Sequence, residues 1–135
     1  MSKRTKIKII VYAALLIVAT VLLIWWFNFN NIRVRDYQRL GDMREVEAEM
    51  NRYFFKFNTY KIPECGEGSV INFCVGAGNK IVNVEKIIDP VNANNLRYVV
   101  NQMADDNFRI EFYLENGLAG LPSGQYALTK EGLGR

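Results

Sequence analysis

The apolar stretch Ile9–Phe27, IIVYAALLIVATVLLIWWF, decides how this 135-residue chain is organised. It contains no charged residue, and only Tyr12 and Thr20 carry a hydroxyl group. As a helix rising about 1.5 Å per residue it would be roughly 28 Å long, close to the thickness of the hydrocarbon core of a bilayer. Two tryptophans stand at one end, where indole rings favour the headgroup region. The stretch predicts a transmembrane helix, and its anchor residues include Ile9, Leu15, Leu22, Trp25, Trp26 and Phe27.

Two other interpretations of the apolar stretch are a buried core helix and a cleaved signal peptide. The rest of the chain is too short to form a second layer around a helix that is apolar on all sides. A signal peptide has a shorter apolar region followed by a small-x-small cleavage site. This stretch instead ends in Trp25-Trp26-Phe27-Asn28. A membrane-spanning helix is therefore preferred to both.

The charges on the two sides of this stretch predict its orientation. The N-terminal side has four cations and no acid, namely Lys3, Arg4, Lys6 and Lys8. Beyond the stretch, acids dilute the arginines of 33–42. Since cytoplasmic flanks carry the excess of Lys and Arg, residues 1–8 are expected in the cytoplasm. Residues 36–135 are then an extracytoplasmic globular domain, in the periplasm or at the cell surface, and 28–35 are a membrane-proximal linker or a continuation of the helix.

The charge balance also restricts the partners of the exported part. The formal net charge is +3, so removing the four N-terminal cations leaves the rest at −1 (3 − 4). Nucleic acid binding needs a concentrated basic footprint. The expected partner is the lipid bilayer, together with other subunits or envelope machinery, and no nucleic acid.

Two cysteines, Cys65 and Cys74, fall in the exported part and enclose a short loop. In an oxidising compartment such a pair is expected to form a disulfide, worth about 2–3 kcal/mol. A metal site is a weaker alternative, because two thiolates fill half of a zinc shell and the chain has no histidine. Free buried thiols are the other alternative. No cofactor is expected.

A second helical pattern follows the polar bridge at 28–35. Apolar side chains recur every three or four residues over 37–57, which indicates one apolar helical face. This stripe consists of Tyr37, Leu40, Met43, Val46 or Glu47, Met50, Tyr53, Phe54 and Phe57. The charged residues between them predict a mixed, solvated face of Arg39, Asp42, Arg44, Glu45, Glu49 and Arg52. Asn58 and Pro63 predict the end of the helix.

The segment after this helix is expected to be mostly irregular. Glycine and proline punctuate residues 63–80, which indicates a loop. A short helix or an extended piece is expected at 81–88. Asp89-Pro90-Val91-Asn92 then predicts a turn.

Strands are expected in the last third of the chain. Residues 96–102 and 108–115 predict two strands joined by a hairpin at 104–107, and the second alternates apolar and polar side chains with period two. A glycine-rich loop is expected at 117–124 and a third strand at 125–129. One helix with one apolar face can bury it only against one apolar face of this small antiparallel sheet, so the fold class is α+β.

The sequence offers little catalytic chemistry. Without histidine the chain lacks the usual general base, and Ser-His and Cys-His catalysis are excluded. Asp105 and Asp106 are a weak candidate for calcium and are more simply a solvated turn. Residues 76–80, GAGNK, lack the spacing and the Ser or Thr of a phosphate loop. The chain is therefore expected not to be an enzyme, with no catalytic, cofactor-binding or metal residues.

The order of these features resembles the type IV pilin and type II secretion pseudopilin class. Three stretches carry the resemblance: Arg35–Arg44, RDYQRLGDMR, just after the membrane; Asp89–Asn92, DPVN, before the sheet; and Phe108–Leu133, with LENG at 114–117 and LTKEGL at 128–133. The resemblance covers most of residues 9–133. It implies a helix packed on an antiparallel sheet, and a structural or assembly role in the cell envelope.

Two features of the family are missing from this chain. Family members are processed after a glycine that precedes their apolar segment, and they carry a glutamate within it. Here no glycine occurs before Gly41, and 9–27 contain no acid. The resemblance thus predicts a non-cleaved, membrane-anchored relative rather than a major filament subunit. The alternative is an unrelated single-pass extracytoplasmic sensor or binding module, which a ligand pocket would favour.

Overall fold

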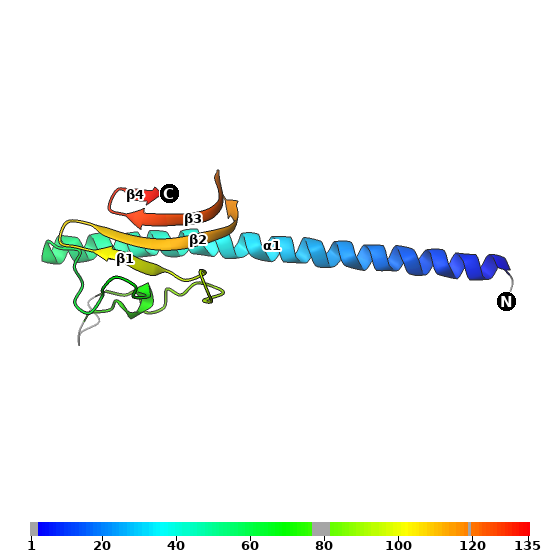
Figure 1. The fold of residues 1–135 in the computed structure, drawn as a ribbon, viewed down its shortest axis with the longest axis horizontal. Coiled ribbons are helices and arrows are strands. Elements are labelled where there is room, and N and C mark those ends of the chain that lie inside the picture. The colour runs from blue at the N-terminus through cyan, green and yellow to red at the C-terminus, as the bar shows by residue number, and fades with distance from the viewer. Residues whose placement is uncertain (1–2, 77–81, 119) are drawn as a thin grey trace.

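The structure is a computed structural model of the whole chain, and it describes residues 3–76, 82–118 and 120–135. In the described residues, a long helix runs into a small domain of one short 3-10 helix and four strands (Figure 1). The elements are α1 (Lys3–Phe57), η1 (Ile71–Phe73), β1 (Val99–Met103), β2 (Phe108–Leu118), β3 (Leu121–Thr129) and β4 (Gly132–Gly134).

Helix α1 is continuous over 55 residues, from the basic N-terminus to the domain. Of the two possibilities for residues 28–35, the structure has a continuation of the helix. The asparagines and Gly41 lower helix propensity, but no proline removes a hydrogen bond from the ladder. The helix ends where predicted: Asn58 takes a left-handed conformation, with φ 55°, and its N–H donates to the Phe54 carbonyl at 2.7 Å.

The N-terminal half of α1 has no protein around it (Figure 1). The described residues contain one helix that is long and apolar enough to cross a membrane, and none of its most apolar 18-residue window is buried in the chain. Each predicted anchor residue is more than half exposed: Ile9, Leu15, Leu22, Trp25, Trp26 and Phe27. An exposed apolar surface of this extent favours contact with a membrane or another apolar surface.

The C-terminal half of α1 packs against an antiparallel sheet of order β1-β2-β3-β4. The alternation predicted in β2 is observed, because the chain buries Phe108, Ile110, Phe112 and Leu114. The core side of α1 supplies Met43, Val46, Met50 and Tyr53. The predicted hairpin between β1 and β2 is closed by the Ala104 N–H donating to the Asn107 carbonyl at 2.8 Å. The α+β layout is confirmed.

Several boundaries in the sheet differ from the sequence predictions. The predicted glycine-rich loop at 117–124 is wrong, since β2 and β3 continue to Leu118 and from Leu121. A bulge between Leu114 and Gly117 lets the strands stay paired through this region. The first strand is β1 at 99–103 rather than 96–102, and β4 was not predicted. The described part of 81–88 forms neither a helix nor a strand.

The predicted faces of the amphipathic helix are partly wrong. Arg39 was assigned to the solvated face and is fully buried, as is almost all of Glu49. Conversely, Tyr37 is 65% exposed and Phe57 is 41% exposed, although both were assigned to the apolar stripe. Arg39 can be buried because a charged side chain can enter the core when it meets partners of opposite charge there.

Cys65 and Cys74 lie at disulfide distance, with their Cα atoms 4.9 Å apart. Both are nearly inaccessible, and the loop that they close carries η1. The pairing favours the disulfide over the two-thiolate metal site and over free thiols.

We expect Cys65 and Cys74 to resist alkylation in denaturant until a reductant is added, because disulfide sulfurs have no free thiol to react. Mass spectrometry of the iodoacetamide-treated chain measures this. The denaturant separates the disulfide from free thiols that are merely buried. Labelling of both cysteines in denaturant without reductant would contradict the disulfide.

Candidate functional site: a buried ion cluster between helix and sheet

A fully buried arginine, Arg39, joins α1 to two distant parts of the chain. Its Nε and Nη2 donate to the two oxygens of Asp89 at 2.6 and 3.1 Å, a bidentate pair. Its Nη1 donates to Asp36 Oδ1 at 2.9 Å and to Glu115 Oε1 at 2.6 Å. Burial by itself lowers the pKa of Arg39, but the hydrogen bonds to Asp89 and Glu115 outweigh it and raise that pKa. The guanidinium therefore stays charged in the core.

The Asp36 carboxylate caps the end of the β2–β3 hairpin. It is fully buried on α1. Its Oδ1 accepts the N–H of Glu115 at 2.9 Å, and its Oδ2 accepts those of Asn116 and Gly117 at 2.8 and 3.0 Å. Three successive backbone donors aimed at one carboxylate form an anion-binding nest. Here the anion is a side chain of the helix, so the hairpin is fixed to α1.

Asp89 fixes the turn before the sheet in the same way. Its Oδ1 accepts the N–H groups of Val91 at 2.8 Å and Asn92 at 3.2 Å, which makes an Asx-type turn. Asn92 has φ 48°, a conformation that asparagine tolerates. The same carboxylate holds Arg39, so the turn 89–92 is attached to the helix as well as closed on itself.

Arg35 and Glu115 form the outer edge of the cluster. The guanidinium of Arg35 donates through Nε and Nη2 to both oxygens of Glu115 at 2.8 Å. These side chains remain 31% and 19% exposed. The hydrogen bond to Glu115 raises the pKa of Arg35. This pair closes the cluster on the side where α1 leaves the domain.

Tyr98 and Asp42 extend the polar contacts beside the cluster. The buried hydroxyl of Tyr98 donates to Asp42 Oδ2 at 2.6 Å. Burial raises the pKa of Asp42, and the hydrogen bond from Tyr98 opposes that rise. Burial and the hydrogen bond to Asp42 both raise the pKa of Tyr98. Asp42, assigned from sequence to the solvated face, is thus a half-buried acceptor.

The Glu115 carboxylate makes the stability of the cluster depend on pH. Hydrogen bonds from Arg35 hold the pKa of Glu115 below its ordinary value of 4.5, against the opposing effect of burial and with help from Arg39. Because this folded-state pKa is depressed, the contribution of Glu115 is fully present above pH 4.5 and is lost as the pH falls through the lower, folded-state value.

We expect Glu115→Gln to flatten the decline of the unfolding free energy below about pH 4.5, because glutamine cannot take up the proton. Urea unfolding of the two proteins at a series of pH values measures the difference. Glu131→Gln, on the exposed turn after β3, is the matched control and should leave the slope unchanged. An identical acid dependence in Glu115→Gln and the parent chain would contradict the assignment.

The weaker sequence candidates for ions lie elsewhere. Asp105 Oδ1 accepts the hydroxyl of Thr59 at 2.9 Å, and the Asp105 carbonyl accepts the N–H of Tyr60. Asp105 thus ties the end of α1 to the β1–β2 hairpin. Within 3–76, 82–118 and 120–135 no three His, Cys, Asp or Glu side chains are placed to hold a metal. Residues 77–80 of the phosphate-loop candidate lie outside the described ranges.

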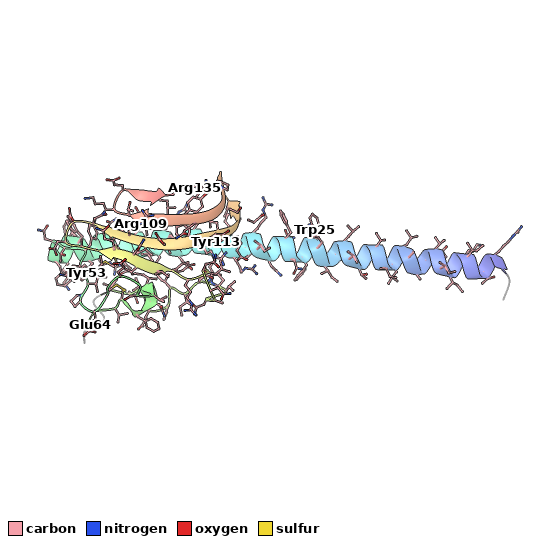
Figure 2. The ribbon with its side chains drawn as sticks, viewed as in Figure 1. Trp25, Tyr53, Glu64, Arg109, Tyr113 and Arg135 are labelled. Atoms are coloured by element: carbon pink, nitrogen blue, oxygen red, sulfur yellow. A yellow bond between two sulfur atoms is a disulfide. The ribbon has the colours of Figure 1, made fainter. Side chains whose placement is uncertain are left out.

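A shallow hollow of about 230 Å³ lies on the side of the sheet away from the core. Strand β2 forms part of its wall, and Arg109 and Tyr113 lie along this strand (Figure 2). The carboxylate in the hollow, Glu111, already accepts hydrogen bonds from Asn101, Arg109 and Gln125 at 2.6–3.2 Å. The carboxylate of the hollow is thus used in hydrogen bonds within the sheet.

The site joins the three stretches that carry the family resemblance. Arg35, Asp36 and Arg39 come from 35–44, Asp89 from 89–92 and Glu115 from 114–117. From sequence, Arg39 was predicted on a solvated helix face, and no ion pair was predicted among these residues. Each of these charged side chains is paired with another, and the pairs join α1 to the turn 89–92 and to the β2–β3 hairpin. Comparison of the chain with protein-family models, curated proteins and solved structures finds no match.

Proposed function

We propose that this chain is a membrane-anchored, pilin- or pseudopilin-like envelope protein with a structural or assembly role in a type IV pilus or type II secretion-like system. Its N-terminus lies in the cytoplasm, its apolar helix crosses the cytoplasmic membrane, and its domain is extracytoplasmic. The observation that carries the proposal is the uninterrupted α1, bare over its apolar half and packed on an antiparallel sheet over the other.

The ion cluster supports a structural role over a catalytic one. Every charged group in it is used in holding α1 to the turn 89–92 and to the β2–β3 hairpin. A helix fixed in this way transmits a force or a position from the membrane to the domain without bending at the junction. This is what an envelope assembly subunit requires, and the proposed activity is not enzymatic.

The chain is proposed to keep its N-terminus. No glycine occurs before Gly41, so a peptidase that cuts after a glycine has no site ahead of the apolar segment. Mass spectrometry of the native protein should find Met1 or Ser2 at the N-terminus. A methylated new N-terminus near residue 9 would overturn the non-cleaved form.

Co-purification from native membranes tests the assembly role itself. We expect pilin-like subunits or secretion machinery to be recovered with the full chain after mild crosslinking in the membrane. Asp36→Asn, which weakens the helix–hairpin junction but not the anchor, should stay in the membrane and recover less partner. Recovery of the intact chain without such subunits would favour the unrelated sensor or binding module.

A further inference from the structure

An aromatic and arginine stack stands on α1 where the apolar segment ends. The rings of Trp25 and Phe29 are stacked with centroids 6.0 Å apart, and the guanidinium of Arg33 lies 5.4 Å from the Phe29 centroid. These residues are four apart, so they form one row on the helix surface. Trp25 lies on the bare part of α1, beyond the end of the domain (Figure 2).

The geometry of α1 places the guanidinium of Arg33 close to the end of the apolar segment. Helical side chains lean toward the N-terminus of their helix, which here is the direction of the membrane. Arg33 accordingly reaches back to the level of Phe29. Phe29 is two residues, or about 3 Å of helix rise, beyond Phe27. Since the headgroup layer is roughly 5–7 Å thick on each side of the hydrocarbon core, the guanidinium lies at the level of lipid phosphates.

Arg33 differs from its neighbouring arginines in what it contacts. Arg35 is paired with Glu115, and Arg39 is paired with Asp36, Asp89 and Glu115. Within the described residues, Arg33 stacks on an aromatic ring and no carboxylate pairs with it. A guanidinium held over a ring keeps its donors free for an oxyanion, and phosphate fits its planar fork.

We propose that Trp25, Phe29 and Arg33 form a binding site for the phosphate of an anionic phospholipid in the leaflet on the domain side. The indole and phenyl rings lie against the glycerol and upper acyl region, while Arg33 binds the phosphate. The bound lipid fixes the depth of α1, and the rigid helix then fixes the height of the domain above the bilayer. This inference rests on the membrane-spanning part of the proposed function and is independent of any pilin-like assembly.

Fluorescence quenching by brominated lipids tests the site in the full chain. Trp26→Phe leaves Trp25 as the single tryptophan. The protein is reconstituted in phosphatidylcholine vesicles that contain a minor fraction of brominated phosphatidylglycerol, and quenching is compared with that by brominated phosphatidylcholine. We expect an affinity for the anionic lipid about fivefold above that for the neutral one, the size of one cation's attraction to an anionic surface. Arg33→Gln in the same background should reduce the ratio to near one.

Controls separate this site from general electrostatics and from failure of the anchor. Arg44→Gln removes an exposed arginine farther along the same helix and should leave the fivefold ratio intact. Inorganic phosphate, added at constant ionic strength, should not displace the lipid, and displacement would overturn a lipid site. Equal ratios in Arg33→Gln and its parent, with normal quenching by brominated phosphatidylcholine, would overturn the lipid site alone. Absence of quenching by either brominated lipid would overturn the membrane anchor as well.

Discussion

Replacing Arg39 with methionine is expected to destabilise the folded domain by about 3–5 kcal/mol. Methionine fills a similar volume but leaves the carboxylates of Asp36, Asp89 and Glu115 close together without their common guanidinium. Removing one member of a buried ion network costs more than the network itself contributes, because the remaining charges stay desolvated. Urea unfolding of the full chain in detergent micelles, followed by the near-ultraviolet circular dichroism of the domain, measures the loss.

Arg35→Met is the matched control for this change. It removes the same group four residues earlier on α1, but Arg35 is 31% exposed and pairs with Glu115 alone. Water can take over its role, so the expected loss is at most about 1 kcal/mol. The effect of Arg39→Met should also shrink at low pH, since the abandoned carboxylates can then be protonated. Equal losses in the two variants would contradict the central position of Arg39.

The long apolar helix and the α+β layout could be predicted because each follows from a pattern in the local sequence. An uncharged run of the length of 9–27 has few stable environments other than a bilayer. The alternation along Phe108–Leu114 leaves one apolar face, which the stripe on α1 can cover. These patterns depend on the local sequence alone, and the structure reproduces them.

The ion cluster could not be predicted, because its partners are far apart in sequence. Arg39 meets Asp89 and Glu115 across 50 and 76 residues, and no local pattern specifies such a pairing. The prediction for the helix faces was wrong at Arg39 because it placed the charged residues between the apolar positions on the solvated face. One signal was present: Asp36 and Arg39 continue the spacing of the core residues Met43, Val46 and Met50 toward the membrane. Charged residues in the register of a core stripe indicate a buried pair.

The strand ends were missed for a related reason. Glycines in 117–124 were interpreted as a loop, since glycine is common in turns. In the structure Gly117 instead permits a bulge with φ 83°, which keeps β2 and β3 paired on both sides of it. Glycine is required there because of its positive φ and because the paired backbone at Leu121–Ser123 leaves no room for a Cβ, a consequence of strand pairing that the local sequence does not reveal.

Gly117→Ala is expected to destabilise the domain by about 3 kcal/mol or more, the second large effect at this junction. A Cβ at this position would overlap the Leu121 carbonyl oxygen, and the φ of 83° strains any side chain. The backbone would have to move, and the N–H that donates to Asp36 Oδ2 at 3.0 Å would move with it. Urea unfolding of the full chain in micelles measures the change.

Gly120→Ala measures the cost of the backbone conformation without the overlap that a Cβ would make at Gly117. Gly120 has nearly the same φ, 84°, but nothing lies within 4 Å of an added Cβ. Its substitution should cost only about 1–2 kcal/mol. In an Asp36→Asn background the effect of Gly117→Ala should become smaller, because the two changes remove the same hydrogen bond and are not additive. Full additivity of the two changes would show that the hairpin is held to α1 by something other than the Asp36 carboxylate. Equal losses at Gly117 and Gly120 would show that the overlap of a Cβ with the facing strand adds no cost.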